Sequence, residues 1–147
     1  MTAKVGSALN VSDLMTPDPI VIGGDEPLAD AARLFDQHRI HGLPVVDPHG
    51  ALIGVISQTD MIRARTTEQL WAGWRGLRVR HLMTSPPLTI GADASLSDAA
   101  GQLEANGVHR LVVLAADGRS PAGILSSSDI VRGMLREGGP DAEEVGR

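Results

Sequence analysis

One seven-residue pattern occurs twice in this chain, and its residue types could hold a sugar and a phosphate. Residues 54–60 read GVISQTD and residues 123–129 read GILSSSD. The aliphatic pair predicts the end of a strand, and the serine predicts the start of a helix. Unpaired N–H groups and the helix dipole favour a phosphate there. The aspartate carboxylate could accept both hydrogen bonds of a ribose diol.

The same spacing also has a purely structural interpretation. A serine followed three residues later by an acidic residue, ahead of an apolar run, is the pattern of a helix capping box. Such a cap contributes only about 1 kcal/mol to stability. The pattern by itself leaves both interpretations open.

The repetition extends over most of the chain. Residues 11–32 align with residues 79–100, and residues 40–46 align with residues 108–114, both at an offset of 68. One extra residue in the second copy raises the offset to 69, and the two seven-residue patterns then coincide. Self-similarity of this kind indicates a duplicated structural unit. We therefore predict a first domain at 11–66, a helical connector at 67–78, a second domain at 79–136 and a disordered tail at 137–147.

Each copy is predicted to mix strands and helices. Residues 12–16 favour a helical turn, and residues 19–22 favour a short edge strand next to two prolines. Pro27 suits the start of a helix. Residues 43–47 and 52–57, joined by the turn PHG, predict a hairpin, and a second helix begins after it. The apolar stripes at helical spacing are Leu28, Ala31, Ala32 and Phe35 in the first copy, and Leu96, Ala99, Ala100 and Leu103 in the second.

The resulting unit is β-α-β-β-α, with helices on one face of its sheet. The other face of the sheet must also be buried. We therefore predict an α+β fold in which two tandem units pack sheet to sheet with pseudo-two-fold symmetry. The tail at 137–147 has no apolar periodicity, which is typical of a disordered segment.

The composition excludes several classes of function. The 147 residues contain no cysteine, so disulfides, thiolate metal sites and cysteine nucleophiles are excluded. A net charge of −5, one phenylalanine and two tryptophans argue against a general nucleic-acid binder. No apolar run approaches the roughly 18–20 residues of a membrane span, and the first ten residues lack an apolar signal core. We expect a cytoplasmic protein.

In order, spacing and duplication, these segments resemble a tandem pair of cystathionine β-synthase-type (CBS) domains, the Bateman module. The resemblance covers residues 11–136 and rests on DLMTPDPIVI, the Leu-x-x-Ala-Ala helix, HGLPVVD and GVISQTD, each with its partner in the second copy. It implies two β-α-β-β-α units packed through their sheets. It also implies clefts that bind AMP, ADP, ATP or S-adenosylmethionine, and assembly into a homodimer.

The resemblance further implies which residues bind the ligand, by their chemical role. They are Asp60 and Asp129 for ribose; Ser57, Thr59, Ser126 and Ser128 for ribose or phosphate; His41, His109 and Arg110 for phosphate; and Ile40, Val55, Val108 and Ile124 for adenine. In the family each cleft draws on both copies, so Ile40 and His41 are expected to face Asp129. Val108 and His109 are expected to face Asp60.

Some positions depart from the family pattern or from exact repetition. Gly42 aligns with Arg110, while Glu26 and Ala94 stand where some members of the family have a threonine. We therefore expect two unequal clefts, with tighter binding of phosphorylated ligands in the cleft of Asp60.

The connector is the remaining distinctive segment. Residues 63–80 carry both tryptophans, and Leu70, Trp71, Trp74 and Leu77 suggest a helix with an apolar stripe. We expect it to pack as the link between the copies. A dimer contact, a partner-docking surface and, last, a nucleic-acid contact remain alternatives.

The sequence favours a stand-alone, non-enzymatic sensor of adenosine-containing ligands. The chain shows no activated nucleophile, no paired acids and no metal-ligand set. It is expected to form a homodimer and to act on an unidentified regulated protein. The alternative is a structural or partner-docking protein whose clefts are empty and whose Ser-x-x-Asp motifs are helix caps only.

Overall fold

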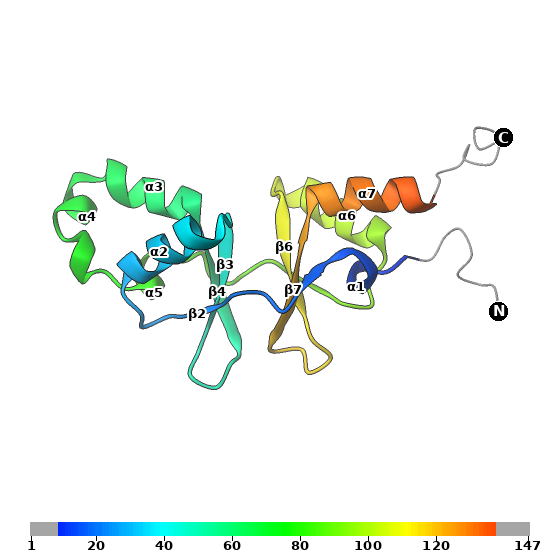
Figure 1. Cartoon of the computed structure of the whole chain (residues 1–147), viewed down its shortest axis with the longest axis horizontal. Helices are drawn as coiled ribbons and strands as arrows, with labels where there is room; N and C mark the ends of the chain where they lie inside the picture. The colour runs from blue at the N-terminus through cyan, green and yellow to red at the C-terminus, as the bar shows by residue number, and fades with distance from the viewer. Residues whose placement is uncertain (1–8, 138–147) are drawn as a thin grey trace. The chain divides into compact units, whose positions relative to one another are not determined.

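The computed structural model describes residues 9–137 and divides into two compact units (Figure 1). The first unit consists of residues 19–87 and 119–121. Of the described residues, the second unit comprises residues 9–18, 88–118 and 122–137. Each unit contains one sheet and several helices, which confirms the α+β class. The packing of one sheet against the other stays a prediction.

The first unit is built on a three-stranded sheet in the order β2-β3-β4. Strand β2 runs parallel to β3, and β3 pairs antiparallel with β4, so the predicted hairpin is confirmed. Helices α2 and α3 lie on one side of this sheet (Figure 1). Its elements are α5 (Val79–Leu82), β2 (Ile22–Gly23), α2 (Leu28–His38), β3 (Gly42–Val46), β4 (Leu52–Ser57), α3 (Gln58–Thr66), α4 (Glu68–Ala72) and the 3₁₀-helix η2 (Trp74–Gly76).

The second unit repeats this plan with a four-stranded sheet in the order β1-β7-β6-β5. Strand β5 runs parallel to β6, and β1 pairs antiparallel with β7. Its elements are α1 (Val11–Leu14), β1 (Thr16–Pro17), β5 (Thr89–Gly91), α6 (Leu96–Asn106), β6 (Arg110–Leu114), β7 (Pro121–Ser126) and α7 (Ser127–Glu137).

The predicted apolar stripes form the cores of the two units. In α2, Leu28 and Ala31 are fully buried and Phe35 is almost so. The equivalent residues of α6 are buried in the second unit. The remaining alanine of each stripe, Ala32 in α2 and Ala100 in α6, is half-buried. The helical spacing of these residues was therefore predicted correctly from the sequence.

Each unit takes its first helix from the start of the other repeat. Val11 and Leu14 of α1 are buried in the core of the second unit. Val79 and Leu82 of α5 are buried in the core of the first unit. The compact units therefore cut across the sequence repeats, because each short helix buries its two apolar side chains against the opposite copy's sheet and helices.

Three local predictions need correction. Residues 19–22 do not form one strand: β1 ends at Pro17 and β2 begins at Ile22. Asp18 has a left-handed φ of 53° and turns the chain, and proline cannot donate to a ladder. The connector is not one helix, since α4 and η2 are separated at Gly73. Glu137, the first residue of the predicted tail, is the last residue of α7; residues 138–147 lie outside the described residues.

None of the helices among the described residues is long and apolar enough to cross a membrane.

Candidate ligand-binding site

The first repeated pattern lies at the junction of β4 and α3. Ser57 is the N-cap of α3, and its Oγ accepts a hydrogen bond from the N–H of Asp60 at 3.3 Å. The Asp60 carboxylate accepts in return from the Ser57 N–H at 2.8 Å and from the Ser57 hydroxyl at 3.0 Å. The capping box is therefore formed, and Asp60 is only 4% exposed.

The second pattern repeats this geometry at the junction of β7 and α7. The N–H of Ser126 donates to Asp129 Oδ2 at 2.8 Å, and the N–H of Asp129 donates to Ser126 Oγ at 3.2 Å. Asp129 is 7% exposed. The structural interpretation of both patterns is therefore confirmed, while their predicted role in ribose binding stays a prediction.

An arginine one turn further along each helix completes the arrangement. Arg63 donates to Asp60 Oδ1 at 3.0 Å and to the carbonyl of Leu82, at the end of α5, at 3.1 Å. In the second unit, Arg132 donates to the aspartate at 2.6 Å and to the carbonyl of Leu14, at the end of α1, at 3.3 Å. Each arginine therefore joins the buried carboxylate to the helix that comes from the other repeat.

The role of these two arginines was not predicted from the sequence. The available signal was their recurrence three residues after the aspartate in both copies, a spacing that brings side chains together on a helix. The carbonyl partner could not be read from the sequence, because it belongs to a distant segment.

The glycine that begins each pattern allows a close approach of the chain. A Cβ atom on Gly54 would lie 2.6 Å from Met83 Sδ, and one on Gly123 would lie 2.5 Å from Met15 Sδ. The segments that approach them also pair with the strands: Thr84 with Val55, and β1 with β7. The two glycines therefore allow the segments around Met83 and Met15 to pack against β4 and β7, the strands that lead into α3 and α7.

The two predicted histidines lie beside the helix starts of their own units. The N–H of Gln58 donates to the carbonyl of His41 at 3.1 Å, and the N–H of Ser127 donates to the carbonyl of His109 at 2.9 Å. Both imidazoles are exposed. Each helix start therefore has an exposed imidazole next to it. The predicted pairing of each histidine with the aspartate of the other copy stays a prediction.

The other predicted site residues fall into two groups. Ile40 and Val108 are partly buried and pack against the cores of their units, and Val55 and Ile124 are partly buried in the middle of β4 and β7. The polar ones are exposed at or near a helix start: Thr59, Ser128 and Arg110.

One carboxylate in the first unit has a clearly perturbed pKa, and it lies at the far end of the β3–β4 hairpin from the helix start. Asp47 Oδ1 accepts from the N–H of Ala51 at 3.0 Å and from that of His49 at 2.8 Å. These bonds, chiefly that of Ala51, lower the pKa of Asp47 from its ordinary value of 3.8. This residue fastens the turn and takes no part in the helix-start arrangement.

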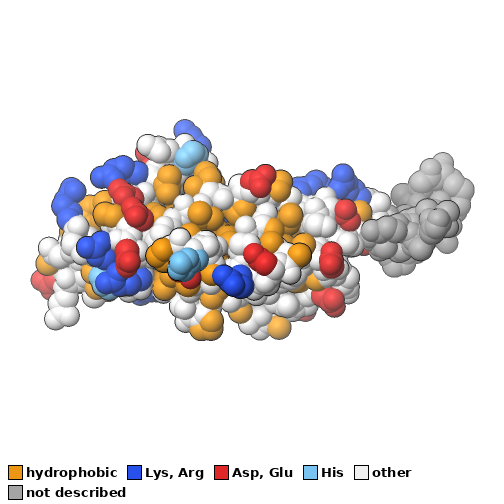
Figure 2. Space-filling model, turned by 90° about the horizontal axis from the view of Figure 1, so that it is seen from below, with side chains coloured by type: hydrophobic (Ala, Val, Ile, Leu, Met, Phe, Trp, Pro, Cys, Tyr) orange, Lys and Arg blue, Asp and Glu red, His pale blue; other side chains and the backbone are white. Residues whose placement is uncertain are grey.

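Charged side chains of both signs are interspersed on the face seen in Figure 2, over the α4 end of the first unit as elsewhere. Ion pairs join Arg80 to Asp25 and Arg33 to Asp30. Within residues 9–137, no three His, Asp or Glu side chains gather as a metal site would require.

A family model of the CBS domain matches residues 11–66 and 79–136. The chain belongs to the CBS domain family. The two matched segments are the two repeats, so each contributes one CBS domain to a pair.

Similar proteins include both small CBS-pair proteins and a larger enzyme. Inosine-5′-monophosphate dehydrogenase from Mycobacterium leprae is 35% identical over 119 residues, which are 80% of this chain but 21% of that enzyme. The chain thus spans about a fifth of the length of that relative.

Two solved structures share the fold along nearly their whole length. CBSX2, a CBS-pair protein of Arabidopsis thaliana, has a crystal structure in complex with AMP that is 33% identical, with a TM-score of 0.75. That alignment covers 86% of this chain and 96% of the other. The CBS domain pair of protein MJ0100, in complex with 5′-methylthioadenosine and S-adenosyl-L-methionine, is 25% identical, with a TM-score of 0.77. It covers 88% of this chain and 98% of that domain pair.

Proposed function

We propose that this CBS pair is a non-catalytic regulatory module that binds an adenosine-containing ligand, namely AMP, ADP, ATP or S-adenosylmethionine. The observation that carries the proposal is the repeated helix start, in which the serine N–H and an arginine donate to a buried aspartate in both units. The complexes of CBSX2 with AMP and of the MJ0100 pair with S-adenosyl-L-methionine support the ligand class.

The ribose is proposed to bind the carboxylates of the two patterns. A carboxylate offers about four acceptor positions. Asp129 accepts two hydrogen bonds from described residues, whereas Asp60 accepts three. Asp129 therefore keeps more capacity for a diol than Asp60.

The phosphate is proposed to bind next to the exposed hydroxyls of the first helical turn and the neighbouring histidines. Thr59 and Ser128 each follow the N-cap by two residues, where the helix dipole favours an anion. Arg110 adds a planar guanidinium suited to bidentate phosphate contact, which its counterpart Gly42 does not supply. We infer tighter binding of phosphorylated ligands where Arg110 contributes.

Regulation would follow from a difference in affinity. A ligand that binds one arrangement of the two units more tightly shifts the population toward it, and a partner protein responds to that shift.

We also propose a cytoplasmic location, with which the lack of cysteine is consistent.

Calorimetry with AMP, ADP, ATP, S-adenosylmethionine and 2′-deoxy-AMP tests the proposal. Saturable binding of at least one ribonucleotide is expected, with weaker binding of the deoxy form. Asp129→Asn keeps the shape of the side chain but removes its charge, which should cost about 1.5–3 kcal/mol per lost charged hydrogen bond. The variant should then distinguish AMP from 2′-deoxy-AMP much less than the wild type does.

Asp98→Asn is the matched control. Asp98 also lies in the first turn of a helix of the second unit, and its N–H is capped by Ser95 Oγ at 3.0 Å, but it is exposed and lies outside the repeated pattern. Its substitution should leave binding unchanged. If no nucleotide in the panel binds at millimolar concentration, the chain is the partner-docking protein of the alternative interpretation, with Ser-x-x-Asp motifs that act only as caps.

We also propose a homodimer, supported by apolar side chains that the chain itself leaves exposed. Ile62 on α3 is 62% exposed, and Val131 and Leu135 on α7 are 58% and 78% exposed. Trp71, which suggested a dimer contact in the sequence, stacks on Trp74 with ring centroids 5.3 Å apart and is 40% exposed. Light scattering at tens of micromolar should show a dimer, and Leu135→Lys should shift it toward monomer.

A further inference from the structure

One contact recurs in both units beside the carboxylates that are proposed to bind ribose. In the second unit, Arg132 Nη2 donates to Asp129 Oδ1 at 2.6 Å and to the carbonyl of Leu14, at the end of α1, at 3.3 Å. In the first unit, Arg63 Nη2 makes the same bonds, to its aspartate at 3.0 Å and to the end of α5 at 3.1 Å. A terminal guanidinium nitrogen has a hydrogen for each of these acceptors, so a single nitrogen joins the carboxylate to the short helix.

Two donors on different oxygens hold the Asp129 carboxylate in one orientation. Arg132 donates to Oδ1, and the N–H of Ser126 donates to Oδ2 at 2.8 Å. Rotation of the carboxylate about its Cβ–Cγ bond would break both hydrogen bonds. Because a carboxylate has about four acceptor positions, about one position stays open on each oxygen. This arrangement matches the two hydroxyls of a ribose diol.

The burial of the carboxylate makes the arginine important for its charge balance. The side chain of Asp129 is 10% exposed, whereas that of Arg132 is 53% exposed. Within residues 9–137, the ion pair with Arg132 is the one that Asp129 forms. Loss of one partner of a buried pair leaves the other charge uncompensated. Removal of the arginine would therefore leave a buried carboxylate that has neither its cation nor its fixed orientation.

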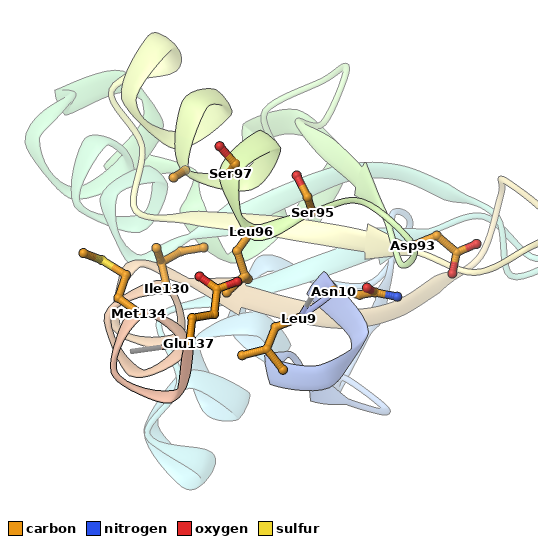
Figure 3. A pocket seen from close by; sticks show the side chains of 10 residues that line it. Leu9, Asn10, Asp93, Ser95, Leu96, Ser97, Ile130, Met134 and Glu137 are labelled. Atoms are coloured by element: carbon orange, nitrogen blue, oxygen red, sulfur yellow. The ribbon is translucent and has the colours of Figure 1, made fainter. Parts of the chain in front are cut away.

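The helix that Arg132 contacts is packed closely against α7. A Cβ atom on Gly133, the next residue along α7, would lie 2.3 Å from Leu14 Cδ1. The residue before α1, the first turn of α6 and the middle of α7 line one hollow, in which Leu9, Leu96 and Ile130 lie close together (Figure 3). Because α1 and α7 approach so closely, a change in the arginine contact would act directly on the position of α1.

We propose that Arg132 and Arg63 are positioning residues for ribose binding. Each holds the neighbouring carboxylate in the orientation that a diol requires and joins that carboxylate to α1 or α5. The inference rests on the proposed function, since it concerns the same carboxylates. A diol bound to Asp129 would fix the carboxylate and the arginine together, and would thereby stabilise the bond to Leu14. By linkage, the intact contact favours the ribose by the same factor.

Calorimetry with AMP and 2′-deoxy-AMP tests the positioning role, in the binding event that Asp129→Asn weakens. Arg132→Met keeps an aliphatic side chain on α7 but removes the guanidinium. The ratio of the affinities for AMP and 2′-deoxy-AMP should fall at least threefold in this variant. Arg132→Lys should restore part of the ratio, because an ammonium also has a hydrogen for each of the two acceptors. The matched control, Arg136→Met, removes a charge on the same helix that forms no ion pair with a described residue, and should leave the ratio unchanged.

A second measurement follows α1 itself. The N–H of Met15 donates to the carbonyl of Val11 at 2.9 Å and closes the turn of this helix, so the NMR resonance of that amide reports on α1. Saturation with AMP should shift the resonance in the wild type. The shift should fall to less than half in Arg132→Met and stay as in the wild type in Arg136→Met.

The outcomes separate this inference from the proposed function. If Arg132→Met binds AMP with an unchanged ratio, the positioning role is wrong, although the proposed function stands. An equal shift of the Met15 amide in the wild type and in Arg132→Met would overturn the link to α1. If the wild type binds no nucleotide, the proposed function fails and the inference fails with it. Circular dichroism checks that the variants fold; should Arg132→Met not fold, Arg63→Met tests the same contact in the first unit.

Discussion

The glycines of the repeated patterns should be intolerant of even a methyl group, and Gly123→Ala is the sharpest test. The added Cβ would lie 2.5 Å from Met15 Sδ and 2.8 Å from the carbonyl oxygen of Thr16, whereas ordinary contacts are 3.4–4 Å. The neighbours would have to withdraw by about 1 Å. Thr16 belongs to β1, which pairs with β7, so its carbonyl cannot withdraw without loosening that pairing.

The expected magnitude is the difference of two effects. Overpacking of a tight site costs about 1–3 kcal/mol. Alanine also lowers the conformational entropy of the unfolded chain, which raises the free energy of unfolding by about 0.4–1 kcal/mol. We expect a net loss of about 1–2 kcal/mol in the free energy of unfolding, which for a chain of this size lowers Tm by about 2–8 °C. Gly54→Ala should behave alike, because its Cβ would meet Met83 and Thr84.

Urea denaturation followed by circular dichroism measures the change, with Gly101→Ala as the control. Gly101 lies on the exposed side of α6, and a Cβ there would meet nothing within 4 Å. That substitution should stabilise the protein by about 0.5–1 kcal/mol, as expected for glycine to alanine in a helix. If Gly123→Ala were as stabilising as Gly101→Ala, the close approach of Met15 and Thr16 to β7 would be contradicted.

Three further perturbations probe the arginine bridge, the hairpin turn and the connector. Arg132→Ala should cost on the order of 1–2 kcal/mol in urea denaturation, reduced because the arginine is half exposed, while Arg33→Ala should cost less than about 0.5 kcal/mol because both partners of its ion pair are exposed. The pKa of Asp47 is lowered in the folded protein, so its contribution to stability is present above the unfolded pKa and is lost as the pH falls through the folded pKa. Denaturation of the wild type and of Asp47→Asn from pH 7 to pH 3 measures this contribution. The difference in stability between the two proteins should shrink on the acidic side. Trp74→Ala should cost on the order of 1–3 kcal/mol, because this partly buried side chain packs on the core. Trp71→Ala, at a residue that is 40% exposed, should cost clearly less in the same assay, and equal losses would contradict the difference in packing.

The sequence by itself determined the local elements and their order. The helical stripe from Leu28 to Phe35, the hairpin around the PHG turn and the capping box of Ser57 and Asp60 are all found as predicted. Each depends on residues within a few positions of one another, where periodicity and side-chain bonds to the nearby backbone act directly. The duplication in the sequence also predicted the family and the recurrence of the helix start in the second copy.

The tertiary structure alone decided which distant segments complete each unit. Arg132 donates to the carbonyl of Leu14, which lies 118 positions away in the chain, and no spacing in the sequence predicts that bond. The same holds for the close approach of Met15 to Gly123, which assigns α1 and β1 to the second repeat's sheet. The repeats offer each short helix two nearly equivalent sheets on which to bury its apolar side chains. The choice between them depends on the packing of whole surfaces, which a local pattern does not encode.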